Sequence, residues 1–186
     1  MSDTASASGA ASMSDTTSDT VPGSVSGAAR AAGTGAGAPD GGLLEPRAVR
    51  LGERPAGRDE AVRRCGRLLV EIGAVAEPYV AAMLEREHDI STYVGEGVAI
   101  PHATNAGKRA VLRDALAVVG FAQPVDWGGS PVSVCVAIAA RGDGHLAVLA
   151  QLAEILLDPP RARALREAAH ADEVLRLLAP AAHALT

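Results

Sequence analysis

Two near-continuous apolar runs decide the fold of this chain: Ala115-Leu-Ala-Val-Val-Gly-Phe121 and Val132-Ser-Val-Cys-Val-Ala-Ile-Ala-Ala140. Both runs are rich in valine, and the turn-forming segment Gln123-Pro-Val-Asp-Trp-Gly-Gly-Ser-Pro131 separates them. Runs of this kind are typical of strands that are covered on both faces. The two runs therefore predict the centre of an α/β sheet.

Upstream of these runs, the sequence predicts two amphipathic helices. The first opens at Arg58-Asp59-Glu60, carries apolar residues at spacings of three and four, and ends at Gly73. The second begins at Glu77-Pro78, with proline at the first helical position, and continues to His88. The stretch 47–51, further upstream, predicts a short edge strand.

Downstream of the runs, the sequence predicts three more helices. The tight connection Arg141-Gly-Asp-Gly144 leads into a stripe of leucines from Leu146 to Leu156, and Asp158-Pro159-Pro160 stops this helix. Two short helices are expected over about 162–169 and 172–178.

The N-terminal segment differs in composition from the rest of the chain. Residues 1–42 are almost entirely Ser, Ala, Gly, Thr and Asp, with too few large apolar side chains to offset the entropy of ordering them. We expect a disordered tail over 1–42 and one domain over 43–182. The expected fold is α/β, with a mixed, mostly parallel central sheet covered by helices on both faces.

Composition argues against several functional classes. The formal charge of −5 and the lack of a basic run argue against a nucleic-acid partner, and 2% aromatic residues argue against stacking platforms. No stretch of about 18 apolar residues and no secretory signal is present, so we expect a cytoplasmic protein without direct membrane insertion. Cys65 and Cys135 lack metal or redox spacing, which predicts buried, reduced thiols and no metal site.

Two of the five histidines stand in unusual surroundings. His102 ends the segment Thr92-Tyr-Val-Gly-Glu-Gly-Val-Ala-Ile-Pro101, whose glycines permit a tight turn and whose proline stiffens the backbone before the imidazole. His145 lies in the first turn of a predicted helix, where free N–H groups and the helix dipole favour an anion. The remaining three, at 88, 170 and 183, are interpreted as exposed histidines without a role.

Taken alone, these residues leave the chemistry open. A metal site would need a third ligand at a reinforcing spacing, and no HxH, HxxxH or HExxH occurs. A hydrolase would need a nucleophile on an elbow, but GxSxG is absent. The residues by themselves indicate a two-histidine anion site of unspecified purpose, with no cofactor.

Four stretches resemble one known family, the IIA domains of the mannitol and fructose class of the bacterial sugar phosphotransferase system. They are Glu77-Pro-Tyr-Val-Ala-Ala-Met-Leu-Glu-Arg-Glu87, the 92–102 segment with its GEGxAxPH block, Ala137-Ile-Ala-Ala-Arg141 with His145-Leu-Ala-Val-Leu-Ala-Gln-Leu152, and Ala171-Asp-Glu-Val-Leu-Arg-Leu-Leu178. The resemblance is nearest to the mannitol branch and extends over most of the chain from Leu43 to Pro180.

The resemblance implies roles for four side chains. His102 matches the family's phosphorylated histidine, His145 the second active-site histidine, Arg86 the active-site arginine, and Glu96 a glutamate ahead of the phosphorylated residue. It further implies a phosphotransferase component with a phosphohistidine intermediate. HPr is then the donor, a IIB domain of the IIB/IIC component is the acceptor, and mannitol is the expected sugar.

One alternative and two departures accompany this resemblance. A regulatory, nitrogen-type IIA protein, which signals by its phosphorylation state, would carry the same site chemistry. Ala103 follows the histidine where glycine is usual, and the 124–131 connection looks shorter than in the mannitol protein. Neither departure removes a reactive group.

Overall fold

The computed structural model describes residues 43–142 and 144–183. Five strands in this part form one sheet, in the order β1-β4-β5-β3-β2. They are β1 (Val49–Glu53), β2 (Tyr93–Gly95), β3 (Val98–Ala99), β4 (Ala115–Asp126) and β5 (Pro131–Ala139). The two apolar runs are thus the long strands β4 and β5 at the centre of the sheet, and β1 is the predicted edge strand.

The sheet is mixed, as predicted, but parallel pairs do not predominate among the described strands. β1 pairs with β4 and β3 with β5 in parallel, whereas β4 pairs with β5 and β2 with β3 in an antiparallel manner. The long β4–β5 pair is antiparallel because the turn between its strands is short, with Trp127 N donating to Ser130 O over 2.8 Å.

Strand β4 is longer than the sequence predicts. The segment expected as a turn from Gln123 belongs to the strand as far as Asp126, after a register shift between Gly120 and Val125. The exposed Pro124 lies within this irregular part, where a missing N–H is tolerated. Only the last residues of the predicted turn therefore reverse the chain.

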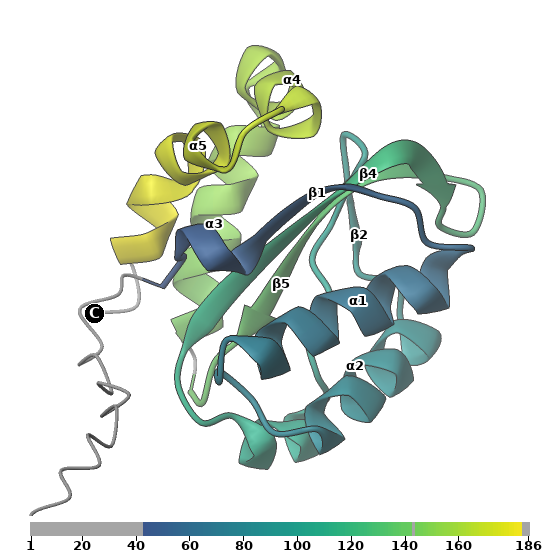
Figure 1. The fold of residues 1–186 in the computed structure, drawn as a ribbon, viewed down its shortest axis with the longest axis vertical. Helices are drawn as coiled ribbons and strands as arrows, with labels where there is room; N and C mark the ends of the chain where they lie inside the picture. Colours follow the sequence, from purple (N-terminus) through teal and green to yellow (C-terminus); the bar gives the residue numbers. More distant parts are fainter. Residues whose placement is uncertain (1–42, 143, 184–186) are drawn as a thin grey trace, which may run out of the picture. The chain divides into compact units, whose positions relative to one another are not determined.

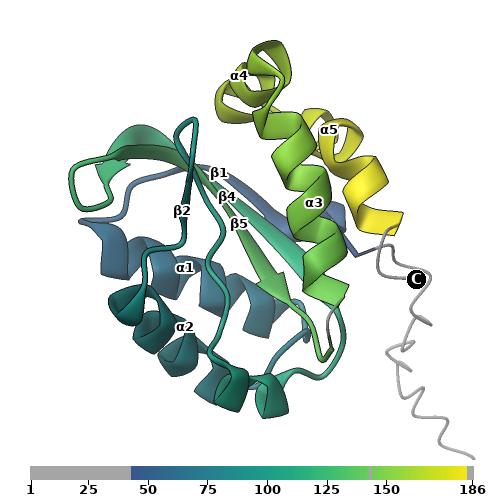
Figure 2. The same cartoon turned by 180° about the vertical axis from the view of Figure 1, so that it is seen from behind.

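Helices cover both faces of the sheet, as predicted. On one face lie α1 (Arg58–Glu71) and α2 (Pro78–Asp89), and α1 packs against β4 and β5 (Figure 1). On the other face lie α3 (Gly144–Leu156) and α5 (Ala171–His183), and α4 (Pro159–Glu167) packs against both of these helices (Figure 2). The core between the layers is almost entirely aliphatic, with strands β4 and β5 buried over most of their length.

The start of α4 differs from the prediction. The prolines that end α3 also begin α4, because proline is favoured in the first helical turn and the Asp158 side chain accepts from Arg161 N over 3.4 Å. The same dipeptide thus stops one helix and starts the next.

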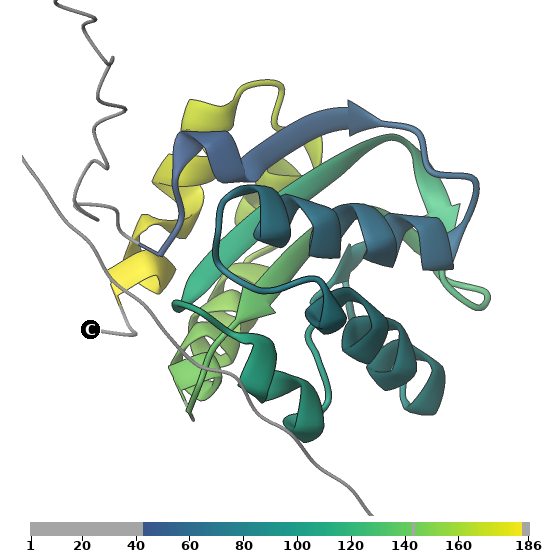
Figure 3. The same cartoon turned by 60° about the horizontal axis from the view of Figure 1, so that its bottom comes forward.

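Two 3₁₀ segments were not predicted: η1 (Pro46–Ala48) and η2 (Asn105–Ala110). η2 lies beside α2 at the lower edge of the domain (Figure 3). It immediately follows the segment that contains His102 and therefore borders the candidate site.

Candidate functional site

The backbone that carries His102 extends the sheet beyond strand β3. Ile100 N donates to Thr92 O over 2.9 Å, and Ile138 N donates to Pro101 O over 3.0 Å. Because β3 and β5 are parallel, His102 emerges at the same edge of the sheet as the end of β5. Carboxyl ends of neighbouring strands are a common place for a ligand in α/β folds.

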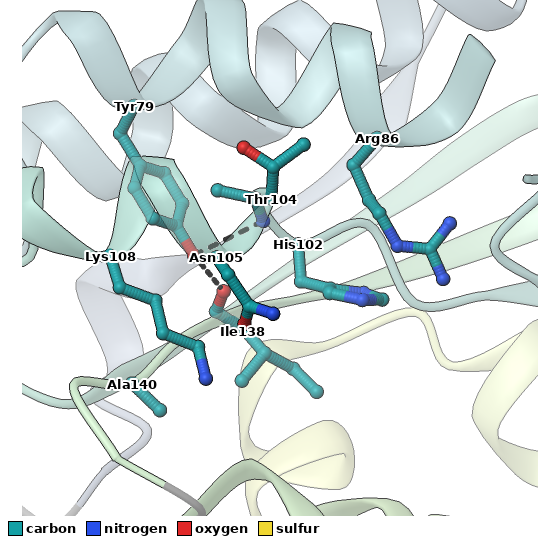
Figure 4. Close-up of a pocket in the computed structure, with 9 residues that line it drawn as sticks. Tyr79, Arg86, His102, Thr104, Asn105, Lys108, Ile138 and Ala140 are labelled. Atoms are coloured by element: carbon teal, nitrogen blue, oxygen red, sulfur yellow. Dashed lines mark hydrogen bonds between the residues drawn. The ribbon is translucent and has the colours of Figure 1, made fainter. Parts of the chain in front are cut away.

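Tyr79 of α2 ties the His102 segment to β5 a second time. Its hydroxyl donates to Ile138 O over 2.7 Å and accepts from Ala103 N over 3.4 Å (Figure 4). The side chain is 2% exposed, and burial raises the pKa of Tyr79 from its ordinary 10.0 to about 12. The phenol is therefore a neutral, buried brace directly behind the histidine.

The imidazole of His102 is held in one tautomer. Its Nδ1 lies 2.8 Å from Ile100 O. A carbonyl oxygen can only accept, so Nδ1 carries a proton, and in the neutral imidazole the lone pair therefore lies on Nε2. The half-buried ring is thereby prepared for attack through Nε2.

His102 opens into a small cavity of about 220 Å³. Two of the side chains around it are cationic, Arg86 and Lys108, and none of the described lining residues is acidic. The lining consists of Tyr79, Arg86, His102, Ala103, Thr104, Asn105, Lys108, Ile138 and Ala140. A cavity with this charge balance is suited to an anion.

Arg86 is brought to this cavity by the last turn of α2. Its Nη1 donates to Ile90 O over 2.6 Å, which caps the end of the helix. Guanidinium has five N–H donors in a planar fork. This one bond therefore fixes the group, and its other N–H groups can still donate hydrogen bonds to a ligand. The structure thus brings together the predicted residues Arg86 and His102.

Lys108 was missed by the sequence analysis. It lies in η2, and Gly107 lets that segment approach α2: a Cβ added at Gly107 would come within 2.5 Å of Ala82 Cβ and 2.8 Å of Ala103 Cβ. The departure at Ala103 is therefore accommodated by a glycine nearby. A usable signal was present, because Lys108 is the only lysine in the sequence.

The structure does not bring Glu96 into this cavity. Glu96 occupies the turn between β2 and β3, with φ of 50°, and its side chain and carbonyl accept from Arg166 Nη1 over 3.1 and 2.6 Å. It lies at the opposite end of β3 from His102 and is not among the residues that line the cavity. The position of Glu96 relative to the cavity therefore does not support its predicted role in the site of His102.

His145 is the second residue of α3, which begins soon after β5 ends at Ala139. Its backbone therefore starts from the sheet edge where His102 emerges. The side chain of His145 lies outside the described residues, so its predicted role as the second active-site histidine stays a prediction.

The other predicted features are placed away from the cavity. Cys65 and Cys135 are free and buried, as predicted, and burial raises the pKa of Cys135. His88 pairs with Asp59 over 3.1 Å at the surface. Over 43–142 and 144–183 there is no group of three or more metal-ligating side chains. None of the helices in the same ranges is both long and apolar enough to span a membrane.

Proteins of similar sequence include two that are named as phosphoryl-transfer proteins of bacteria. The chain is 40% identical over 136 residues to the multiphosphoryl transfer protein of Escherichia coli O157:H7, covering 73% of this chain but only 36% of that protein. It is 36% identical over 136 residues to the mannitol-specific phosphotransferase enzyme IIA component of Halalkalibacterium halodurans, covering 73% of this chain and 94% of the relative. The chain thus spans about a third of the first relative and nearly all of the second.

Solved structures agree with these relatives. The fold matches a chain in the NMR structure of the complex of enzyme IIAMTL and phosphorylated enzyme IIBMTL from Escherichia coli, with a TM-score of 0.68 and 33% identity, over 74% of this chain and 99% of the other. Residues 43–180 match the family described as "Phosphoenolpyruvate-dependent sugar phosphotransferase system, EIIA 2". Since this match includes every described strand and the whole cavity lining, the chain belongs to the EIIA 2 family of the sugar phosphotransferase system.

Proposed function

We propose that this protein is a cytoplasmic phosphocarrier that accepts a phosphoryl group from phospho-HPr on His102 and passes it to a IIB domain for mannitol uptake. One observation carries the proposal: the imidazole of His102, fixed with its proton on Nδ1, opens into a cavity with two cations and no acid among its described lining residues. Such a site combines a nucleophile with stabilisation of an anionic group.

The transfer step conserves the phosphoryl group and the electron pairs. The Nε2 lone pair of His102 forms a new N–P bond while the P–N bond to the donor histidine breaks, and that bond's electron pair returns to the donor ring. The Nδ1 proton stays on His102, where the Ile100 carbonyl 2.8 Å away stabilises the positive charge that develops on the ring. In onward transfer, an acceptor side chain on the IIB domain forms a bond to phosphorus while the N–P bond to His102 breaks. The electron pair of that bond returns to Nε2 of His102.

The surrounding residues would act mainly by charge and orientation, as phosphoryl transfer requires. Arg86 would hold phosphoryl oxygens, and His145, in the first turn of α3, would donate a hydrogen bond to them. Glu96 lies outside the cavity, and we propose that it holds the turn before β3 rather than the phosphoryl group.

Two relatives support the choice of partners. One is named as a multiphosphoryl transfer protein, and one solved structure holds enzyme IIAMTL with phosphorylated enzyme IIBMTL. HPr as donor and a IIB domain as acceptor are therefore the partners to test first.

The test is phosphoryl labelling from phosphoenolpyruvate with enzyme I and HPr. We expect one acid-labile, base-stable label on the wild type and none on His102→Ala. His145→Ala should keep some label but transfer it poorly. His88→Ala, which removes a surface histidine paired with Asp59, is the matched control and should label normally. A label that persists on His102→Ala would refute the assignment.

The regulatory alternative is separated by the acceptor. A transport component should pass its label to a mannitol IIB domain and support mannitol phosphorylation. A protein that labels fully but transfers to no IIB domain would instead act as the nitrogen-type signalling module.

A further inference from the structure

Lys108 is an unusual residue in an unusual place. Lysine and arginine together number 17 in this chain, and Lys108 is the only lysine among them. It is half-buried, lines the cavity of His102, and forms no ion pair within the part of the chain that the structure describes. A cation without a carboxylate partner, beside a nucleophilic histidine, has capacity for an anionic ligand.

The segment that carries Lys108 is pressed against α2. Thr104 N donates to Ala82 O over 3.3 Å, and Gly107 N donates to Thr104 O over 2.9 Å. The absent side chain at Gly107 permits this approach. The backbone of Lys108 is thus held at the rim of the cavity, while its four-carbon stem leaves the ammonium able to move.

The two cations of the cavity come from different elements. In Figure 4, Arg86 and Lys108 flank His102 on opposite sides, and Asn105 stands between Lys108 and the ring. Arg86 is anchored by its bond to Ile90 O. Lys108 is a compact point charge, which can follow an oxygen that moves during transfer.

From this arrangement we infer that Lys108 is a second cationic ligand of the phosphoryl group on His102, acting opposite Arg86. The inference rests on the proposed function and adds a catalytic residue to it. A phosphoryl group brings about −1.5 to −2 charges near neutral pH, which one arginine only partly balances. Lys108 supplies the remaining charge and contacts the group during both arrival and departure.

The main test compares three variants. Lys108→Met keeps the length of the stem and removes the charge, Lys108→Arg keeps the charge, and Arg109→Met removes a cation from the next residue, which does not line this cavity. We expect the rate of labelling by phospho-HPr to fall by about tenfold or more in Lys108→Met, since a charged hydrogen-bond donor is lost. Lys108→Arg should retain most of the rate, and Arg109→Met should stay near the wild type.

A second readout depends on contact rather than on folding. The phosphoryl group titrates near pH 6, and a nearby cation favours its more ionised form. Among the described residues, the charged groups that line the cavity are Arg86 from α2 and Lys108 from η2, and β5 and the residue that follows it contribute only Ile138 and Ala140. In ³¹P NMR, Lys108→Met should therefore raise the titration midpoint by on the order of one unit, and Arg109→Met should not.

A third readout uses the wild-type protein and needs no variant. Because the chain has one lysine, acylation by an N-hydroxysuccinimide ester followed by peptide mass spectrometry reports on Lys108 alone among its side-chain amines. Phosphorylation of His102 should slow this acylation by about tenfold, and His102→Ala taken through the same labelling reaction should show no slowing.

The outcomes separate this inference from the function on which it rests. A wild type that takes no label overturns both. A labelled wild type whose Lys108→Met variant keeps the same rate and the same midpoint overturns the role of Lys108 alone, as does equal acylation with and without phosphate. An equal loss in Arg109→Met would show a general surface charge effect and would also overturn it.

Discussion

The two ends of the short strand β3 are held in opposite ways. At the end that leads to His102, the chain is fixed by buried bonds: Ile138 N to Pro101 O, and Tyr79 to both Ile138 O and Ala103 N. At the other end, Glu96 pairs with Arg166, and their side chains are 51% and 24% exposed. Buried hydrogen bonds are costly to break, whereas exposed ion pairs contribute little. The comparison indicates that the position of His102 is set by the buried bonds to β5 and α2 and not by the turn at Glu96.

The largest expected effect is at the buried end. Tyr79→Ala removes a 2%-exposed ring and both of its hydrogen bonds, so the free energy of unfolding should fall by about 3–5 kcal/mol. Tyr93→Ala, in β2 and only half-buried, is the control and should cost clearly less. Denaturant unfolding of the two variants measures this difference. Equal losses would contradict the inference that the burial and the hydrogen bonds of Tyr79 hold the His102 segment.

The same tyrosine predicts a pH dependence. Its folded pKa of about 12 exceeds the ordinary 10.0, so its stabilisation is complete below pH 10 and is lost as the pH rises through about 12. The two-unit difference corresponds to about 2–3 kcal/mol. Tyr79→Phe lacks the titrating group, so its stability deficit relative to the wild type should shrink over this interval. A deficit that stays constant from pH 9 to 12 would remove the argument for a buried, neutral phenol.

A smaller effect is expected where η2 meets α2. Gly107→Ala places a Cβ within 2.5 Å of Ala82 Cβ and 2.8 Å of Ala103 Cβ. We expect a loss of about 1–2 kcal/mol, in the lower part of the range for overpacking, because a short surface segment can shift. Adding Ala103→Gly removes one of the two clashes and should recover part of the loss, which a double-mutant cycle of thermal unfolding would measure. Purely additive losses would show that the two residues do not share this space.

The difference between the two ends also explains what could be predicted from the sequence. Long strands and helices follow from apolar runs and periodic apolar residues, so β5, α1, α2 and α3 were found with bounds close to the observed ones, and β4 was found but continues further, to Asp126. The strand β3 has two residues and β2 has three, too few to show a period. Their existence depends on pairing with β5 and with each other, which is a tertiary effect.

The candidate site was predictable to a similar degree. Arg86 and His102 were identified by resemblance, and the structure brings both to one cavity. Glu96 was grouped with them because it matches a glutamate of the family that precedes the phosphorylated histidine, yet an extended segment carries residues a few positions apart to opposite ends of a strand. Lys108 was missed because no periodic or motif signal marks a 3₁₀ segment whose placement depends on close packing at Gly107.

The smallest effect is expected at the exposed end and gives the sharpest test of the comparison. Glu96→Gln removes the charge that pairs with Arg166 but leaves the bond from Arg166 Nη1 to the Glu96 carbonyl, 2.6 Å long, in place. The free energy of unfolding should therefore fall by no more than about 1 kcal/mol, and labelling of His102 should stay near the wild-type rate. Arg166→Gln, which also loses the bond to the carbonyl, is the matched variant and should cost slightly more. If Glu96→Gln instead lost most of its labelling while its stability was unchanged, the glutamate would act on the chemistry across the length of β3. The turn would then position His102 as much as the buried bonds do.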